Sequence, residues 1–337
     1  MRFSSLLLFA FALWPGMVNA QNHVLKLATL APEGSNWTKA LRAIDADVRQ
    51  RTDGAVSFKL YTGGVQGDEK TMLRKIRIGQ LHAGAFGGQG ACEIVSDLLA
   101  LEVPFLFEDY DEIDYVLEKT YSYYDSAFAD RGYVFLGWAD IGFVHILSKR
   151  PVRGIDDIKG VKVWRLEGEP ITDVLFRKAK VSSVPLIIPD VLLGLQTNLV
   201  EVVYAPPAAA IVLQWFTRVS YVTELPINYS LGALLVAQKP FSRLSDQDQK
   251  TVRQVSVKHM REQIRQSRSD NEEAFQVLKD QGLELVAPDA EQLRLFRDLV
   301  DESISELVGD ALSTTAYQMV LDHLAEYRSA RTSGDAP

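Results

Sequence analysis

The chain has 337 residues, of which 47% are apolar and 24% charged. This balance is that of an ordinary globular protein and excludes a disordered chain, a collagen-like repeat and a multi-span membrane protein. The formal charge is −8, and an acidic surface repels phosphate backbones, so we expect no nucleic-acid partner. With Cys92 as the single cysteine no disulfide forms within the chain, and the five histidines are too scattered to indicate a local metal site.

The first twenty residues have the pattern of a cleavable export signal. Arg2 precedes an apolar run at 6–13, which Pro15 and Gly16 end, and small residues place the predicted cut after Ala20. The alternative is an uncleaved anchor, but the apolar run is short against the roughly 20 residues that span a bilayer. We therefore expect an exported, soluble product.

Strand-like apolar runs alternate with helix-like segments over the first two thirds of the chain. The expected order is strand 24–30, helix 37–52, strand 56–61, helix 69–78 and strand 83–86, with longer strands at 142–149 and 232–239. Beyond residue 246 the pattern becomes helical, at 247–278 and 290–328, and we expect residues 329–337 to form a disordered tail. Strand and helix alternation predicts an α/β fold with mainly parallel sheets.

Two parts of the chain repeat the same order of elements. Residues 25–34 run from a strand through Glu-Gly into a helix, and residues 161–168 repeat that order, with Pro170 well placed to open the second helix. A second pair, 79–86 and 197–204, also matches. The repeats predict two lobes of similar α/β design.

The predicted lobes divide the chain in a discontinuous way. Lobe I comprises 21–144 plus about 231–275, and lobe II comprises 145–230 plus about 276–328, with the C-terminal helices bracing both. The strands at 142–149 and 232–239 are expected to be the hinges. Ligands bind beyond the carboxyl ends of strands in α/β sheets, so the cleft should be lined by four segments, namely 32–37, 84–90, 164–168 and 204–207. Helix N-termini and free backbone N–H groups at such a place favour an anion.

Motifs of common catalytic chemistry are missing from the sequence. There is no G-x-x-x-x-G-K-[ST], no G-x-S-x-G, no H-E-x-x-H and no Cys-His metal pattern. We therefore predict no catalytic residues, no metal and no cofactor. An exported enzyme with dispersed catalytic residues stays a remote alternative.

Several segments in order resemble a known family. They include LATLAPEGSNW at 27–37, TGGVQGDEKTMLRKIRIGQLHAGAF at 62–86, IDDIKGVKVWRLEGEPI at 155–171 and LQWFTRVSYVTELP at 213–226. The chain is similar to the DctP-type extracytoplasmic solute-binding proteins of tripartite ATP-independent periplasmic (TRAP) transporters. The resemblance implies a two-lobed, type II-like periplasmic-binding-protein fold with hinge strands and long C-terminal helices. It also implies a periplasmic receptor that delivers a small organic anion to the small and large membrane subunits, without catalysis.

The resemblance makes Arg165 the first candidate for the ligand's carboxylate, because a guanidinium can bind a carboxylate through two parallel hydrogen bonds. The alignment is uncertain by one residue. Trp164 could occupy the family's arginine position, with Arg165 in a loop and paired to Glu167 or Glu169. Glu167 is kept among the candidate site residues.

The second lobe also offers an apolar wall. Residues 202–213 are almost wholly apolar apart from the hydroxyl of Tyr204, and Ala205 stands where many family members carry a polar residue. Unpaired ligand hydroxyls would cost roughly 1–3 kcal/mol each against such a wall. We therefore expect a carboxylate ligand with a substantial apolar part, or alternatively a lipid-like apolar ligand on the same scaffold. The other interpretation is that residues 202–213 face only the core and do not line the cleft.

The remaining candidates come from both lobes. Ser35 is also a plausible N-cap, and the glycine loop either presents backbone N–H groups to a ligand or forms a tight turn. The full set of candidate ligand-binding residues is Arg165, Trp164, Glu167, Tyr204, Ala205, Pro206, Phe86, Gly87, Gly88, Gln89, Glu33, Ser35, Trp37, Trp215 and Tyr229.

Overall fold

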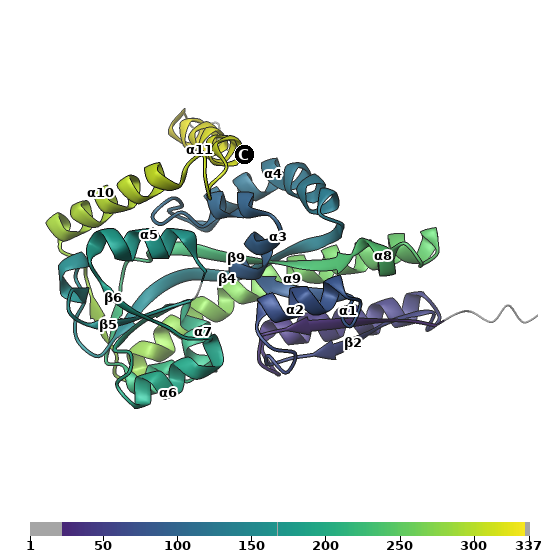
Figure 1. Ribbon diagram of the computed structural model, residues 1–337, viewed down its shortest axis with the longest axis horizontal. Helices are drawn as coiled ribbons and strands as arrows, with labels where there is room; N and C mark the ends of the chain where they lie inside the picture. Colours follow the sequence, from purple (N-terminus) through teal and green to yellow (C-terminus); the bar gives the residue numbers. More distant parts are fainter. Residues whose placement is uncertain (1–21, 167, 334–337) are drawn as a thin grey trace, which may run out of the picture.

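The computed structural model describes residues 22–166 and 168–333. The predicted signal peptide and the candidate Glu167 therefore lie outside the described residues. Two α/β halves share one long strand, and helices cover both (Figure 1).

The first half is a sheet in which three parallel strands meet two antiparallel ones. The order is β2 (Val56–Tyr61), β1 (His23–Thr29), β3 (Ala83–Gly87), β9 (Asn228–Ala237) and β4 (Tyr133–Ser148). Its helices are α1 (Asn36–Arg51), α2 (Glu69–Arg77), α3 (Gly88–Ile94) and α4 (Tyr110–Asp130). Ser35 caps α1 by accepting from the N–H of Thr38, and Leu41, Ile44 and Val48 form its buried face.

The second half repeats that design. β5 (Lys162–Arg165) lies between β6 (Ser182–Pro185) and β7 (Val202–Ala205) and is parallel to both, as β1 is to β2 and β3. An antiparallel strand follows in each half, β4 beside β7 and β9 beside β3. The predicted repeat of strand order is therefore confirmed.

The second half also contains shorter elements. They are α5 (Pro170–Ala179), α6 (Val191–Gln196), α7 (Pro207–Val212), β8 (Tyr221–Thr223) and β10 (Glu284–Val286). Short 3-10 helices occur at Ser96–Leu101 in the first half and at Ile155–Ile158, Ile188–Asp190 and Trp215–Arg218 in the second.

β4 joins the two halves, because it belongs to both sheets. Residues 133–144 pair with β9, and residues 145–148 pair with β7. The hinge predicted at 142–149 thus lies almost wholly in β4, and its first half still pairs in the first sheet. The hinge predicted at 232–239 was misplaced, because residues 232–237 pair with β3 and β4 inside the first sheet and helix α8 (Gln238–Phe241) follows.

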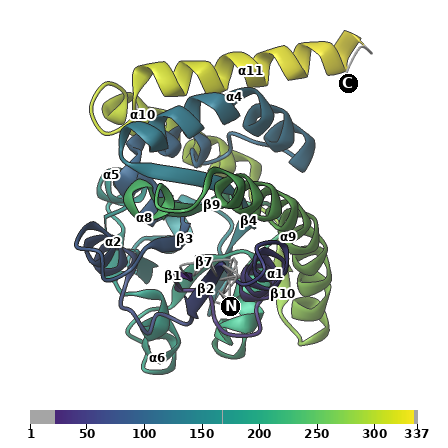
Figure 2. The same cartoon turned by 90° about the vertical axis from the view of Figure 1, so that its right-hand side faces the viewer.

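Three C-terminal helices cover the outside of the molecule. α9 (Asp246–Asp280) packs on β4, on α1 of the first half and on α7 of the second, so it spans both. α10 (Ala290–Leu307) packs on α5, and α11 (Thr314–Ser333) lies along α4 (Figures 1 and 2). Residues 329–333 therefore belong to a helix, which corrects the tail expected from residue 329. In the described part of the chain, none of the helices is both long and apolar enough to cross a membrane.

Candidate functional site

A cavity of about 400 Å³ lies where the strand ends of the two halves face each other. All four segments predicted to line the cleft contribute to its wall. They supply Pro32, Ser35, Asn36, Trp37, Ala85, Gly87, Gly88, Gln89, Trp164, Leu166, Gly168, Tyr204, Ala205 and Pro206. The rest of the wall is mostly apolar, with side chains such as Val144, Val163, Leu175 and Phe176.

Ten of the fifteen candidate residues line this cavity. They are Ser35, Trp37, Gly87, Gly88, Gln89, Trp164, Tyr204, Ala205, Pro206 and Trp215. Among the described candidates, Arg165, Phe86, Glu33 and Tyr229 are not in the wall. The ligand contacts of all fifteen stay predictions.

Trp164, and not Arg165, turns into the cavity wall from β5. The Trp164 indole Nε1 donates to the carbonyl of Leu186 at 2.9 Å, and its ring lies against Tyr204 and Trp215. The Arg165 guanidinium instead pairs with Asp173 of α5 at 2.7 Å. Neighbouring residues on a strand point to opposite faces, so only one of these two can face the cavity.

The other three candidates have structural contacts of their own. Phe86 is fully buried in the core of the first half. Glu33 is exposed and accepts two hydrogen bonds from Arg42 at 2.8 Å. The hydroxyl of Tyr229 is buried and donates to Asp140 at 2.8 Å.

The glycine loop after β3 holds a carboxylate of the chain itself. Glu69, the first residue of α2, accepts from the N–H of Gly87 and from that of Gly90, each at 2.6 Å. The N–H of Gly87 therefore donates to a carboxylate of the chain, which favours a structural role for this part of the glycine loop over presentation of that N–H to a ligand. A Cβ on Gly90 would lie 2.6 Å from a Glu69 oxygen, so a glycine is needed for this approach.

Three glutamates in the wall were missed from the sequence. Burial is the main cause that raises the pKa of Glu69 and of Glu169 to about 7 and that of Glu102 to about 8. Glu69 and Glu169 lie in charged stretches and look like surface residues. Glu102 stands within the apolar run LLALEVPFLF at 98–107, and that run was a signal that it is buried. The sheet topology brings the three glutamates to one cavity.

The described wall carries no Arg, Lys or His side chain. Nor does any group of three or more His, Cys, Asp or Glu within 22–166 and 168–333 have the arrangement of a metal site. The wall therefore offers apolar surface, aromatic rings, carboxyl groups and some hydroxyl and amide side chains, such as those of Ser35, Asn228 and Ser230.

Comparison with known proteins identifies the family. The pattern of DctP, the bacterial extracellular solute-binding protein family 7, matches residues 27–309. The chain belongs to this family. Among its relatives, the sialic acid-binding periplasmic protein SiaP of Vibrio cholerae is 22% identical over 82% of this chain and 86% of its own. The 2,3-diketo-L-gulonate-binding periplasmic protein YiaO of Escherichia coli is 21% identical over 71% and 73%.

Solved structures share the fold of this family 7 protein. A TRAP periplasmic solute-binding protein of Xanthobacter autotrophicus with bound β-D-galacturonate is 18% identical, with a TM-score of 0.82 over 89% of this chain and 99% of that one. One from Desulfovibrio salexigens with bound orotic acid is 16% identical, with a TM-score of 0.81 over 90% and 99%. The predicted two-lobed α/β fold and the predicted family are confirmed.

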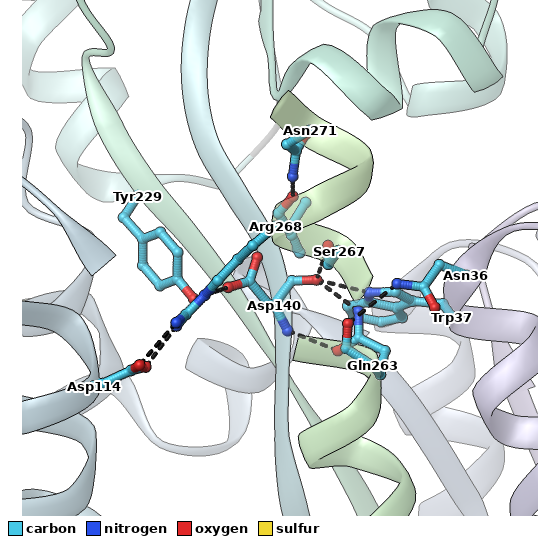
Figure 3. Close-up of polar contacts among 10 residues, drawn as sticks. Asn36, Trp37, Asp114, Asp140, Tyr229, Gln263, Ser267, Arg268 and Asn271 are labelled. Carbon is cyan, nitrogen blue, oxygen red and sulfur yellow. Dashed lines mark hydrogen bonds and ion pairs between the residues drawn. The ribbon is translucent and has the colours of Figure 1, made fainter. Parts of the chain in front are cut away.

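The family 7 chain has a polar cluster where β4 passes between its lobes (Figure 3). The carbonyl of Asp140 accepts from Trp37, Gln263 and Ser267 at 2.8–3.0 Å. Its carboxylate accepts from Arg268 at 3.0 Å. Two residues of α9 thus hold the same carbonyl that Trp37 of the first half contacts.

Asn271 extends this cluster into the second half. Its amide donates to the carbonyl of Ile141 at 2.9 Å and accepts from the N–H of Ala208 at 3.0 Å. α9 therefore connects the crossing strand with α7, which carries part of the cavity wall.

Proposed function

We propose that this chain is a periplasmic solute receptor of the TRAP type. It captures one small organic acid with a substantial apolar part between its lobes and delivers it, chemically unchanged, to the small and large TRAP membrane subunits. The signal peptide would direct export and be cleaved after Ala20.

The observation that carries the proposal is the cavity between two like-built halves. Its volume of about 400 Å³ falls within the range of pockets that bind small molecules. Loops at the strand ends of both halves form its wall, so a ligand inside it touches both lobes at once.

The chemistry of the wall supports a ligand with an apolar body. Trp164, Tyr204 and Trp215 form one aromatic surface, with ring centroids 4.7 and 5.1 Å apart. Burying an apolar group there contributes roughly 25 cal/mol per Å². A sugar ring would leave hydroxyls unpaired against these side chains, at roughly 1–3 kcal/mol each. Relatives named for sialic acid and 2,3-diketo-L-gulonate support the acid class, and not this apolar preference.

Delivery depends on a change in the lobes' relative position. A ligand that contacts both halves stabilises their closed arrangement, and β4 with its polar cluster provides an ordered connection about which they move. The membrane subunits would then distinguish the closed receptor from the open one.

Native mass spectrometry of freshly purified protein tests the proposal. We expect one additional mass per chain, lost on denaturation, that corresponds to a small organic acid with an apolar part. An acyl or isoprenoid mass would instead support the lipid-like carrier. If no ligand co-purifies, thermal unfolding with a panel of aryl and alkyl carboxylic acids replaces this measurement, and a panel without any stabilising compound contradicts the proposal.

A further inference from the structure

A receptor for organic acids needs a group that binds a carboxylate, and the described wall has no basic side chain for that purpose. It has buried carboxyl groups from both lobes instead: Glu102 follows the 3-10 turn Ser96–Leu101 of the first half, and Glu169 precedes α5 of the second. We propose that Glu102 and Glu169 act as neutral carboxylic acids whose O–H groups donate to the ligand's carboxylate, so that ligand and proton are bound together. This inference rests on the proposed function.

One carboxyl oxygen of Glu102 has no hydrogen-bond partner. The backbone N–H of Leu231 and the hydroxyl of Ser230 lie near the carboxyl and partly offset the rise of its pKa that burial causes. Its Oε1 is buried beside Gly88 at the cavity wall and has no hydrogen-bond partner in the described part of the chain. A buried polar atom without a partner costs about 1–3 kcal/mol, and a ligand oxygen that accepts from a protonated Oε1 removes that cost.

Glu169 is bonded in a similar way. Its Oε2 accepts from the hydroxyl of Tyr204 at 3.1 Å and from that of Thr172 at 3.2 Å. Tyr204 is held in turn by the N–H of Leu166, which donates to its hydroxyl at 3.3 Å. These donors fix one oxygen of Glu169 as an acceptor, which leaves the other to carry the proton.

The remaining titratable groups of the wall do not supply this donor pair. Glu69 accepts two backbone N–H bonds, and Asp270 accepts from Gln266 at 2.7 Å. Asp140 also lines the cavity, and its Oδ1 has no hydrogen-bond partner in the described part of the chain. Its Oδ2 accepts from Tyr229 and from Arg268, and the charge of Arg268 favours the ionised carboxylate. The thiol of Cys92 is kept neutral because burial raises its pKa. Of the bases close by, Arg165 pairs with Asp173, and the ammonium of Lys70 lies near Gly168.

The protonated form of both groups is accessible near neutral pH. Burial raises the pKa of Glu102 to about 8 and that of Glu169 to about 7, and the two charges oppose each other. A ligand carboxylate in the cavity raises the pKa of both glutamates further, whereas a ligand ammonium would lower the pKa of both. An acid ligand is therefore bound with net uptake of protons, and an amine would be bound with their release.

The sign of the pH dependence follows from this coupling. Below the pKa of the free receptor the site is protonated and the affinity is constant. Above it, each group that must regain a proton weakens the apparent affinity tenfold per pH unit. With a pKa of about 8, Glu102 alone predicts an affinity about tenfold weaker at pH 9 than at pH 6.

Isothermal titration at pH 6 and pH 9 with three matched probes tests the inference. The probes are 3-phenylpropanoate, 3-phenylpropan-1-amine and 3-phenylpropan-1-ol, which share one apolar body. We expect the acid to bind most tightly at pH 6, at least tenfold more weakly at pH 9, and with proton uptake at pH 9 measured from buffers of different ionisation enthalpy.

The variant Glu102→Gln separates the proton from the hydrogen bond. Its amide keeps an acceptor oxygen for Leu231 and Ser230 and places an N–H donor at the free position, so we expect binding with about tenfold less pH dependence. Glu118→Gln, on the exposed face of α4, is the matched control and should behave as the wild type.

The outcomes distinguish failure of the inference about the two glutamates from failure of the proposed receptor function. Tighter binding of the amine than of the acid, or an acid affinity equal at both pH values, overturns the inference and leaves the receptor function intact. Failure of all three probes to bind counts against the proposed function itself.

Discussion

At the scale of single residues, the site is shaped by glycines that make room for acids. A Cβ on Gly88 would lie 1.9 Å from the Oε1 of Glu102, and one on Gly90 would lie 2.6 Å from Glu69. Glycine is required here for space and not for an unusual backbone angle. The loop therefore holds two carboxyl groups of the chain at the cavity.

A pair of alanine variants tests this requirement. Gly88→Ala should displace the Glu102 carboxyl and weaken acid binding at least tenfold, because the new methyl group occupies its position. Gly87→Ala meets its nearest atom at an ordinary 3.6 Å and leaves Glu102 in place, so we expect a smaller loss of affinity there than at Gly88. Titration calorimetry compares the two, and equal affinities would contradict the account of Gly88.

The role of Arg165 can be decided in the same way. Its guanidinium pairs with Asp173 outside the described wall, so we expect Arg165→Ala to bind acid ligands within about threefold of the wild type. A loss of tenfold or more would show that Arg165 leaves Asp173 to reach the ligand, as the sequence suggested. Asp173→Ala is the control for loss of the ion pair alone.

At the scale of elements, the connection through β4 depends on close packing against α9. Gly142 has a φ of +118°, and a Cβ there would lie 2.3 Å from the Asn271 amide. That amide holds the carbonyl of Ile141, so displacing it also removes a bond between strand and helix.

Substitution at this point should be costly. We expect Gly142→Ala to lower the free energy of unfolding by about 3 kcal/mol, from backbone strain and loss of the Asn271 bonds. Gly132→Ala, with a φ of +81° and no atom within 4 Å, should cost only about 1–2 kcal/mol from strain alone. Urea unfolding compares them, and equal losses would mean that the Asn271 contact contributes nothing.

At the scale of the whole molecule, local patterns closely predicted the strands and helices up to β3, but not α3, α4 or the first part of β4. The expected helix 37–52 is α1 at Asn36–Arg51, and the expected strand 56–61 is β2. The repeat predicted the second sheet, since β5 and β7 occupy the positions of β1 and β3. The hinge at 232–239 was misplaced because a buried run of β-prone residues does not show where the chain changes sheets.

The site was only partly predictable for a related reason. Its wall segments follow from strand ends, which the sequence marks. The meeting of Glu69, Glu102 and Glu169 depends on tertiary distances that no spacing encodes. The choice between Trp164 and Arg165 depends on which face of β5 each occupies, and an alignment uncertain by one residue cannot decide that.

Three buried acids also predict how stability varies with pH. The folded state keeps Glu69, Glu102 and Glu169 protonated above the usual value of 4.5, whereas the unfolded chain releases those protons. Their stabilising contribution is therefore present at low pH and is lost as pH rises toward 7–8. Burial lowers the pKa of His82 and His145, so these two histidines make the stability rise with pH, which opposes the effect of the three acids. The histidine effect ends near pH 6.5, because above that value both side chains are neutral in the folded and unfolded states.

The clearest window is therefore pH 6.5 to 8. We expect the free energy of unfolding of the ligand-free protein to fall there by about 1.4 kcal/mol per pH unit from Glu102 alone. Glu102→Gln should flatten this slope, whereas Glu118→Gln should not. Denaturant unfolding at several pH values measures it, and stability that rises over this window would contradict the assignment of neutral buried acids.

The account's central claim is that one ligand lies in the cavity between the lobes. A crystal structure of the receptor with a bound organic acid tests it most directly. We predict density for one molecule between the aromatic surface of Trp164 and Tyr204 and the carboxyl group of Glu102. Density instead in the basic hollow beside α2 and α8, which Arg77, Arg131 and Lys239 line, with the central cavity unchanged, would contradict the account.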